Sequence, residues 1–131
     1  MLTKEGHVQY WMAQADDDWE ATEILFSSKK YLQSLFWGHL VLEKICKALW
    51  ILNHESNSPP KIHNLIYLIG QTPLAPPDEL MEIMIEANRF QLEGRYPEYR
   101  KELYQQTNQA NSRALLDRYN TLRLWLKQQL P

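Results

Sequence analysis

The sequence has little glycine, one cysteine and no long apolar run. Only four of its 131 residues are glycine, and β-branched residues nowhere alternate over a sustained stretch, so a β-sheet has little sequence from which to form. The single cysteine, Cys46, excludes an internal disulfide and fits a reducing compartment. Because Cys46 follows Leu42 and Ile45 in an apolar run, it is expected to be a buried thiol rather than a catalytic nucleophile.

No segment approaches the roughly 20 apolar residues of a membrane span, and the first 20 residues contain no apolar stretch of signal-peptide length. The expectation is a cytoplasmic protein without a membrane segment. The net charge of -2 argues against strong non-specific binding to nucleic acid, which needs a concentrated basic surface. This net charge does not exclude a small local basic site.

Motifs that would assign an enzyme class are also missing. The sequence has no glycine-rich phosphate loop, no nucleophile elbow and no paired-cysteine motif. His39 and His54, the nearest histidines within one predicted helix, are fifteen residues apart, which does not match the i, i+4 spacing of paired metal ligands. Neither a metal nor a cofactor is expected, and no catalytic residue is assigned.

Apolar residues at helical spacing fill most of the chain, in four long segments and one short one. Pro59 and Pro60 end the second segment, and Gly70 ends the short one. The predicted long helices are about 4–27, 32–53, 79–93 and 108–129, and the short one lies within 62–70. The sequence thus predicts a single all-α domain over residues 1–131, an antiparallel bundle of four long helices plus one short helix.

The second predicted helix carries a polar stripe. His39, Glu43, Lys47, Trp50 and His54 fall within an arc of about 80° on an ideal helix. One interpretation is a face exposed to water, with a Glu43–Lys47 pair that contributes a few tenths of a kcal/mol. The other is a polar groove or a partner or dimer face, composed of His39 and Glu43 with Trp50 as its anchor.

The stretch "RFQLEGRYPEYR" predicts a corner between two helices. Gly94 tolerates the positive φ of a helix C-terminus, and Pro97 holds Tyr96 extended while it can itself start a helical turn. Arg95 and Arg100 would then lie near this corner. The planar guanidinium suits a phosphate, but it suits a neighbouring carboxylate equally well.

Taken together, these segments resemble the HEPN domain, a small helical module named for higher eukaryotes and prokaryotes nucleotide-binding. The resemblance covers almost the whole chain, in the segments "WMAQADDDWEATEIL", "SLFWGHLVLEKICKALWI", "KIHNLIYLI" and "RFQLEGRYPEY". Its second-helix signature matches Glu43, Lys44 and Lys47, and its Arg-Tyr-Pro segment begins at Arg95. The resemblance implies a bundle of four or five helices, and nucleotide or partner binding by Arg95 and Lys47. Tyr96 and Arg100, beside Arg95 at the predicted corner, are further candidates for ligand binding.

Many bacterial members of that family are similar to partners of small nucleotidyltransferases of the MNT type, frequently in toxin–antitoxin pairs. Members that are ribonucleases use an arginine followed four to six residues later by a histidine. This sequence departs from that pattern, because no histidine follows His63. The resemblance therefore implies a noncatalytic protein that binds a nucleotidyltransferase, a nucleotide or RNA.

Two alternatives remain open. The first is a ribonuclease with an unconventional site built from His39, His54 or His63, and the second is a purely structural interaction module. Five tryptophans and seven tyrosines are also many for a chain of this length, and aromatic side chains left exposed in a patch usually mark an interface. A homodimer is expected, with Trp37 and Trp50 as candidates for its interface.

Overall fold

The computed structural model describes residues 2–93 and 95–131, and these form six helices without a strand. The predicted all-α fold is confirmed. Four helices are long and two are short: α1 (Lys4–Ser27), α2 (Tyr31–Leu52), α3 (Leu65–Gly70), α4 (Asp78–Glu93), α5 (Pro97–Gln106) and α6 (Gln109–Gln128).

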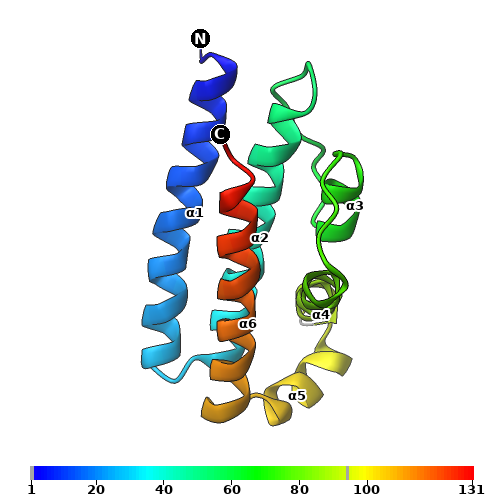
Figure 1. Ribbon diagram of the computed structural model, residues 1–131. Helices are drawn as coiled ribbons and strands as arrows, with labels where there is room; N and C mark the ends of the chain where they lie inside the picture. The colour runs from blue at the N-terminus through cyan, green and yellow to red at the C-terminus, as the bar shows by residue number, and fades with distance from the viewer. Residues whose placement is uncertain (1, 94) are drawn as a thin grey trace.

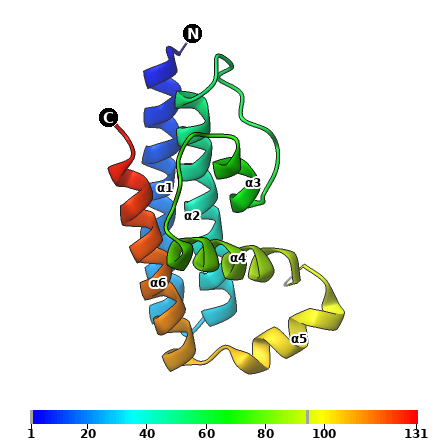
Figure 2. The ribbon, with the colours of Figure 1, turned by 45° about the vertical axis from the view of Figure 1, so that its right-hand side comes forward.

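Three of the long helices stand side by side, and the fourth lies across them. Helix α1 runs antiparallel to both α2 and α6, which are parallel to each other (Figure 1). Helix α4 is nearly perpendicular to these three, and α5 leads from its far end back to the start of α6 (Figure 2). The crosswise α4 gives the bundle a second layer, which α3 extends.

Helix α2 is the centre of the fold because it packs against α1, α3, α4 and α6. The other helices bury only one face each, whereas α2 buries residues around most of its circumference. The core residues of α2 are Leu32, Leu35, Val41, Leu42, Ile45, Cys46, Ala48, Leu49, Trp50 and Ile51. The charged side chains buried on this helix, Glu43 and Lys47, therefore need partners inside the protein.

Side-chain caps and a proline set several of the helix ends. Thr3 accepts a hydrogen bond from the Gly6 amide at the start of α1, and Asn108 accepts one from the Asn111 amide at the start of α6. Pro97 is the first residue of α5, where its missing N–H has no intrahelical partner to lose. The boundaries of the four long helices agree with the predicted ones to within one residue.

Helix α5 was not predicted as a separate element. Only Leu103 of its ten residues is buried, so the segment lacks the apolar stripe by which a helix is recognised in a sequence. Gly94, the predicted end of the preceding helix, lies outside the described residues. None of the described helices is both long and apolar enough to cross a membrane.

Candidate functional site

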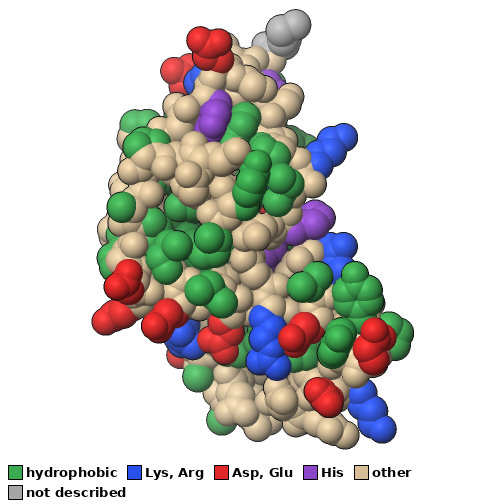
Figure 3. Space-filling view, turned by 90° about the vertical axis from the view of Figure 1, so that its right-hand side faces the viewer, with side chains coloured by type: hydrophobic (Ala, Val, Ile, Leu, Met, Phe, Trp, Pro, Cys, Tyr) green, Lys and Arg blue, Asp and Glu red, His purple; other side chains and the backbone are tan. Residues whose placement is uncertain are grey.

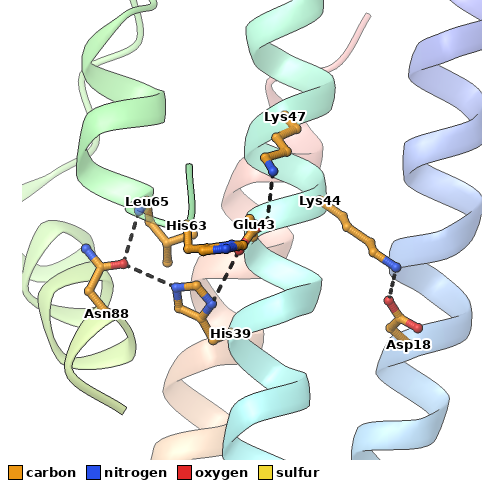
Figure 4. A network of polar contacts seen from close by, with 8 residues as sticks. All are labelled: Asp18, His39, Glu43, Lys44, Lys47, His63, Leu65 and Asn88. Carbon is orange, nitrogen blue, oxygen red and sulfur yellow. Dashed lines mark hydrogen bonds and ion pairs between the residues drawn. The ribbon is translucent and has the colours of Figure 1, made fainter. Parts of the chain in front are cut away.

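A buried carboxylate, Glu43 on α2, lies at the centre of a polar cluster (Figure 4). Its Oε2 atom accepts a hydrogen bond from Lys47 Nζ at 3.0 Å, one helical turn further on. Its Oε1 atom lies 2.9 Å from Nδ1 of His63, which precedes α3. Both members of the Glu43–Lys47 pair are more than nine-tenths buried, so each charge depends on the other in a medium of low dielectric constant.

A second part of the cluster joins three helices through Asn88 of α4. Its Oδ1 atom accepts a hydrogen bond from the Leu65 amide at 3.0 Å and lies 3.2 Å from His39 Nε2. Its Nδ2 atom donates to Oδ1 of Asn64, the N-cap of α3, at 2.9 Å. The backbone N–H of Leu65 can only donate, so the Asn88 atom that it contacts must be the acceptor oxygen, Oδ1. The same oxygen faces His39. His39 Nε2 must therefore carry a proton.

His39 is neutral at pH 7 because of its environment. Burial lowers the pKa of its imidazole, and this effect exceeds the opposing effects of the Asn88 hydrogen bond and the Glu43 charge. The Nδ1 atom of His39 faces Glu43 Oε1 at 3.8 Å, which is beyond hydrogen-bond distance. His39 thus links α2 to α4 as a neutral hydrogen-bond donor. The closest polar contacts of the Glu43 carboxylate are with His63 and Lys47.

His63 is the member of the cluster that reaches the surface. Half of its side chain is exposed, and its Nδ1–H donates to the buried Glu43 carboxylate. Its Nε2 atom makes no hydrogen bond within residues 2–93 and 95–131. A carboxylate behind a partly exposed imidazole fixes the tautomer and leaves Nε2 able to accept a proton, as in a general base.

The prediction that the polar stripe of α2 faces water is wrong. His39, Glu43, Lys47 and Trp50 are only 1, 5, 7 and 8% exposed. Helices α1, α3 and α4 all pack on α2, and helical spacing alone does not show how many neighbours cover a helix. Asn88 had not been predicted as part of a site, because its partners are distant in sequence and no spacing rule connects them.

Trp50 is part of the core in this structure. Its ring stacks on the His54 imidazole with centroids 3.8 Å apart, and its indole N–H donates to Gln71 Oε1 at 2.8 Å. Of the two tryptophans predicted at a dimer interface, Trp37 is the one at the surface, with 38% of its area exposed. Of the residues predicted for a partner or dimer face, His39, Glu43 and Trp50 are therefore buried, and Trp37 is exposed.

The other predicted residues lie at the junction of α4 and α5. We call residues 92–93 and 95–104 the α4–α5 corner. Tyr96 is extended before Pro97, as predicted, and both Arg95 and Arg100 are exposed. With the Gln91 amide turned so that its oxygen faces Arg95, the guanidinium donates to it from Nε at 3.0 Å and from Nη2 at 2.6 Å. Arg95 is thus held by a neutral side chain, and its charge remains available.

Four large apolar or aromatic side chains are exposed at this corner. Leu92, Tyr96, Tyr99 and Tyr104 are 57, 47, 48 and 50% exposed. The rings of Tyr96 and Tyr99 meet edge to face, with centroids 6.4 Å apart. The face of the molecule that carries α4 and α5 shows hydrophobic side chains interspersed with charged ones (Figure 3). Tyrosine and arginine exposed together are typical of a binding surface.

The structure does not bring the predicted ligand-binding residues into one site. Lys47 is buried beside Glu43, on the side of α2 that faces Trp11 of α1. The α4–α5 corner extends away from α1 and α2 (Figure 2). Lys47 and Arg95 therefore belong to two different places, and a cleft lined by both is not formed. Within the described residues, no group of three or more His, Cys, Asp or Glu side chains is arranged to hold a metal ion.

Comparison with known proteins identifies the family. No curated protein and no solved structure gave a significant match. The family model described as HEPN domain matches residues 8–129, which include all six helices except the first residues of α1. The matched range includes the central α2 and the α4–α5 corner. The chain belongs to the HEPN domain family.

Proposed function

We propose that this HEPN protein is a noncatalytic binding module whose α4–α5 corner contacts a protein partner. The supporting observation is the exposed surface of Tyr96, Tyr99 and Tyr104, with Arg95 and Arg100 in the same segment. Tyrosine and arginine carry a large share of the binding energy at protein interfaces. The family resemblance makes a small nucleotidyltransferase of the MNT type the candidate partner, in a toxin–antitoxin-type module.

The lack of a suitable histidine supports a noncatalytic role. Arg89, Arg95 and Arg100 have no histidine after them in the chain, and at neutral pH no other side chain takes over the role of an imidazole without a perturbed pKa. Arg89 is moreover paired with Glu93, at 2.8 Å between Nε and Oε2. Arg95 faces the neutral Gln91 amide, which makes its charge the more available one for a partner carboxylate or a nucleotide phosphate.

The test is co-expression with the nucleotidyltransferase encoded by a neighbouring reading frame, followed by calorimetry on the separate proteins. We expect Arg95→Ala to weaken binding by about 1.5–3 kcal/mol, the contribution of one hydrogen bond to a charged group. Arg95→Lys should weaken binding by a smaller amount, since the lysine ammonium keeps the charge but lacks the planar fork of the guanidinium. Because Arg95 is exposed, neither variant should lower the free energy of unfolding by more than about 1 kcal/mol.

Arg118→Ala is the matched control, since Arg118 is an exposed arginine that pairs with Glu86, and neither residue belongs to the α4–α5 corner. It should leave partner binding unchanged. The same titrations with ATP in place of the protein test the nucleotide-binding part of the proposal. If Arg95→Ala melts early while binding per folded molecule is unchanged, the corner is structural and the proposal is wrong.

A homodimer is part of the proposal. Trp37 and the tyrosines of the α4–α5 corner expose aromatic area that a monomer leaves in water. Light scattering at tens of micromolar should give twice the chain mass, and a monomer mass at that concentration would contradict it.

One observation favours a ribonuclease as the second candidate. The His63 imidazole is oriented by the buried Glu43 and is half exposed, which is how a general base is positioned. The discriminating measurement is cleavage of a labelled single-stranded RNA by the wild type and by His63→Ala. Cleavage that is lost in His63→Ala would establish this candidate, and RNA left intact by the wild type would exclude it.

A further inference from the structure

A pocket of about 320 Å³ lies between the first half of α1 and the segment that connects α2 to α3. Trp11 lines it from α1, Lys47 from α2, and Asn57, Pro59 and Lys61 from the connecting segment. The volume is at the lower end of the range for pockets that hold small molecules. The α4–α5 corner contributes no residue to this pocket, and neither does His63.

The charged side chains that line the pocket are all basic. None of the eight described residues that line the pocket is an aspartate or a glutamate, whereas two are lysines and one is His7. The chain as a whole has more acidic than basic residues, 16 against 14. Because the lining differs in sign from the rest of the protein, the pocket favours an anion over a cation.

Lys47 offers hydrogen-bond donors to this pocket. An ammonium group has three N–H donors, and within the described residues Lys47 Nζ makes one hydrogen bond, to Glu43 Oε2 at 3.0 Å. The same atom lies 5.7 Å from the centre of the Trp11 ring. The side chain of Lys47 is only 8% exposed, so a hydrogen bond from it to a ligand would form where little water competes.

The neighbouring Glu43 limits how much negative charge the ligand can carry. Glu43 compensates the charge of Lys47, and Lys61 is then the one lysine of the lining whose charge has no ion-pair partner among the described residues. Counted over the side chains that line the pocket, the charge left for a ligand at pH 7 is therefore close to one. A singly charged carboxylate matches this better than a phosphate monoester, which carries close to two charges at that pH.

The wall of the pocket is already ordered. Lys4 Nζ donates to the carbonyl oxygens of Ile51 and His54, at 3.0 and 2.7 Å, and to Asn57 Oδ1 at 2.9 Å. These bonds hold the connecting segment against α1, with Asn57 in the lining. A ligand that enters this pocket loses little free energy in ordering the protein.

We propose that this pocket binds a small aromatic monocarboxylate. The carboxylate accepts hydrogen bonds from Lys47 Nζ and pairs with Lys61, and the flat ring packs on Trp11. The anion supplies the acceptor that Lys47 lacks, and the ring covers apolar surface of the indole. This site is independent of the function proposed for the α4–α5 corner.

The experiment is a titration of the full chain with benzoate, followed by the amide and indole signals of ¹⁵N-labelled protein. Benzoate should shift the Trp11 indole N–H and the amides of residues 57–61 in a saturable manner. Benzamide, a neutral molecule of the same shape, should bind at least about tenfold more weakly because it lacks the charge. Phenyl phosphate should also bind more weakly than benzoate.

Variants separate this site from the rest of the protein. Lys61→Gln should weaken benzoate binding severalfold, and Trp11→Leu should reduce it further. Lys101→Gln, an exposed lysine on α5, and Arg95→Ala should both leave it unchanged. Equal binding of benzoate and benzamide, or the absence of saturable shifts, would overturn the proposal. Tighter binding of phenyl phosphate would also overturn it, in favour of a phosphate site.

Discussion

Gly38 on α2 lies directly against the ring of Tyr119 on α6. A Cβ atom on Gly38 would be 2.8 Å from Tyr119 Cδ2, closer than two carbon atoms pack. Tyr119 is fully buried, so a shift of its ring would disturb the packing around it. The close packing of α2 on α6 at this level thus requires glycine.

We predict that Gly38→Ala destabilises the protein although alanine is the better helix former. Overpacking a buried site costs about 1–3 kcal/mol, and the gain in helix propensity offsets about 1 kcal/mol of it at most. The expected net loss is up to about 2 kcal/mol, measured by urea denaturation. Gly70→Ala is the matched control, because a Cβ atom added there would have no heavy atom within 4 Å. Gly70→Ala should be neutral or slightly stabilising, and equal stability of both variants would show that the Tyr119 ring gives way.

A second prediction concerns the buried ion pair. Glu43→Gln leaves the Lys47 ammonium buried without a counter-charge, which should lower the free energy of unfolding by about 3–5 kcal/mol. Glu93→Gln removes the partner of Arg89 from an exposed pair and should cost less than about 1 kcal/mol. Urea denaturation of the two variants makes the comparison.

A double variant tests whether the loss comes from the uncompensated charge. Glu43→Leu combined with Lys47→Met replaces the pair by apolar side chains, so that no buried charge is left alone. The double variant should be more stable than Glu43→Gln. If it is less stable, the hydrogen bond from His63 to Glu43 contributes more than the pair itself.

The third prediction is a loss of stability as the pH falls below about 6.5, the ordinary pKa of histidine. Burial lowers the pKa of His39 in the folded protein, so below this pH the unfolded chain binds a proton that the folded protein does not. The stability contribution is complete above the unfolded pKa and declines as the pH decreases. The groups that face His39 are Glu43, Asn88 and His63.

His39→Gln isolates this effect, since an amide does not titrate. Urea midpoints measured between pH 7.5 and 5 should fall more steeply for the wild type than for the variant. Glu23 is a separate contribution: its hydrogen bond with Arg113 lowers the pKa of its carboxyl below the ordinary value, so it acts in a lower pH range. Parallel curves for the two proteins would show that His39 is not the group responsible.

Much of the fold follows from helical periodicity, and the exceptions have physical causes. Leu80, Ile83, Met84 and Ala87 recur at helical spacing and are all buried, because α4 has one apolar face and packs on one side. On α1, the buried residues are Val8, Ala15 and Thr22, and the large aromatic residues at the same helical spacing are only partly covered. Helix α5 was not predicted, because its tyrosines are exposed and only Leu103 is buried, so its apolar residues show no helical periodicity.

The candidate sites were less predictable because they depend on tertiary contacts. The sequence indicated the Glu43–Lys47 pair and named His63 separately, but only the fold shows that the Glu43 carboxylate is buried and contacts both. Asn88 and Lys4 had no signal in the sequence, since their partners are 23 or more residues away. Arg95 and Tyr96 were correctly placed at a helix corner, because the geometry before a proline is local.

The last prediction concerns Lys4, whose ammonium group lies at the C-terminal end of α2. It donates to the carbonyl oxygen of Ile51, one of the groups that a helix end leaves without an intrahelical partner, and to that of His54, which follows the C-cap Asn53. The amides of Asn53 and His54 bond to the Trp50 and Ile51 carbonyls in the same turn. Lys4→Met should therefore loosen this turn, because the apolar side chain fills the space but donates no hydrogen bond.

We expect Lys4→Met to cost about 2 kcal/mol, within the range for one hydrogen bond to a charged group. The local signature is hydrogen exchange: the Asn53 and His54 amides should exchange at least about tenfold faster, since opening free energies differ along a chain. Amides of α6, to which Lys4 donates no hydrogen bond among the described residues, should change only as far as global stability does. Lys30→Met, at an exposed lysine before α2, should leave both sets unchanged. Uniform acceleration over the whole chain would instead mean that Lys4 contributes to global stability without fixing this turn.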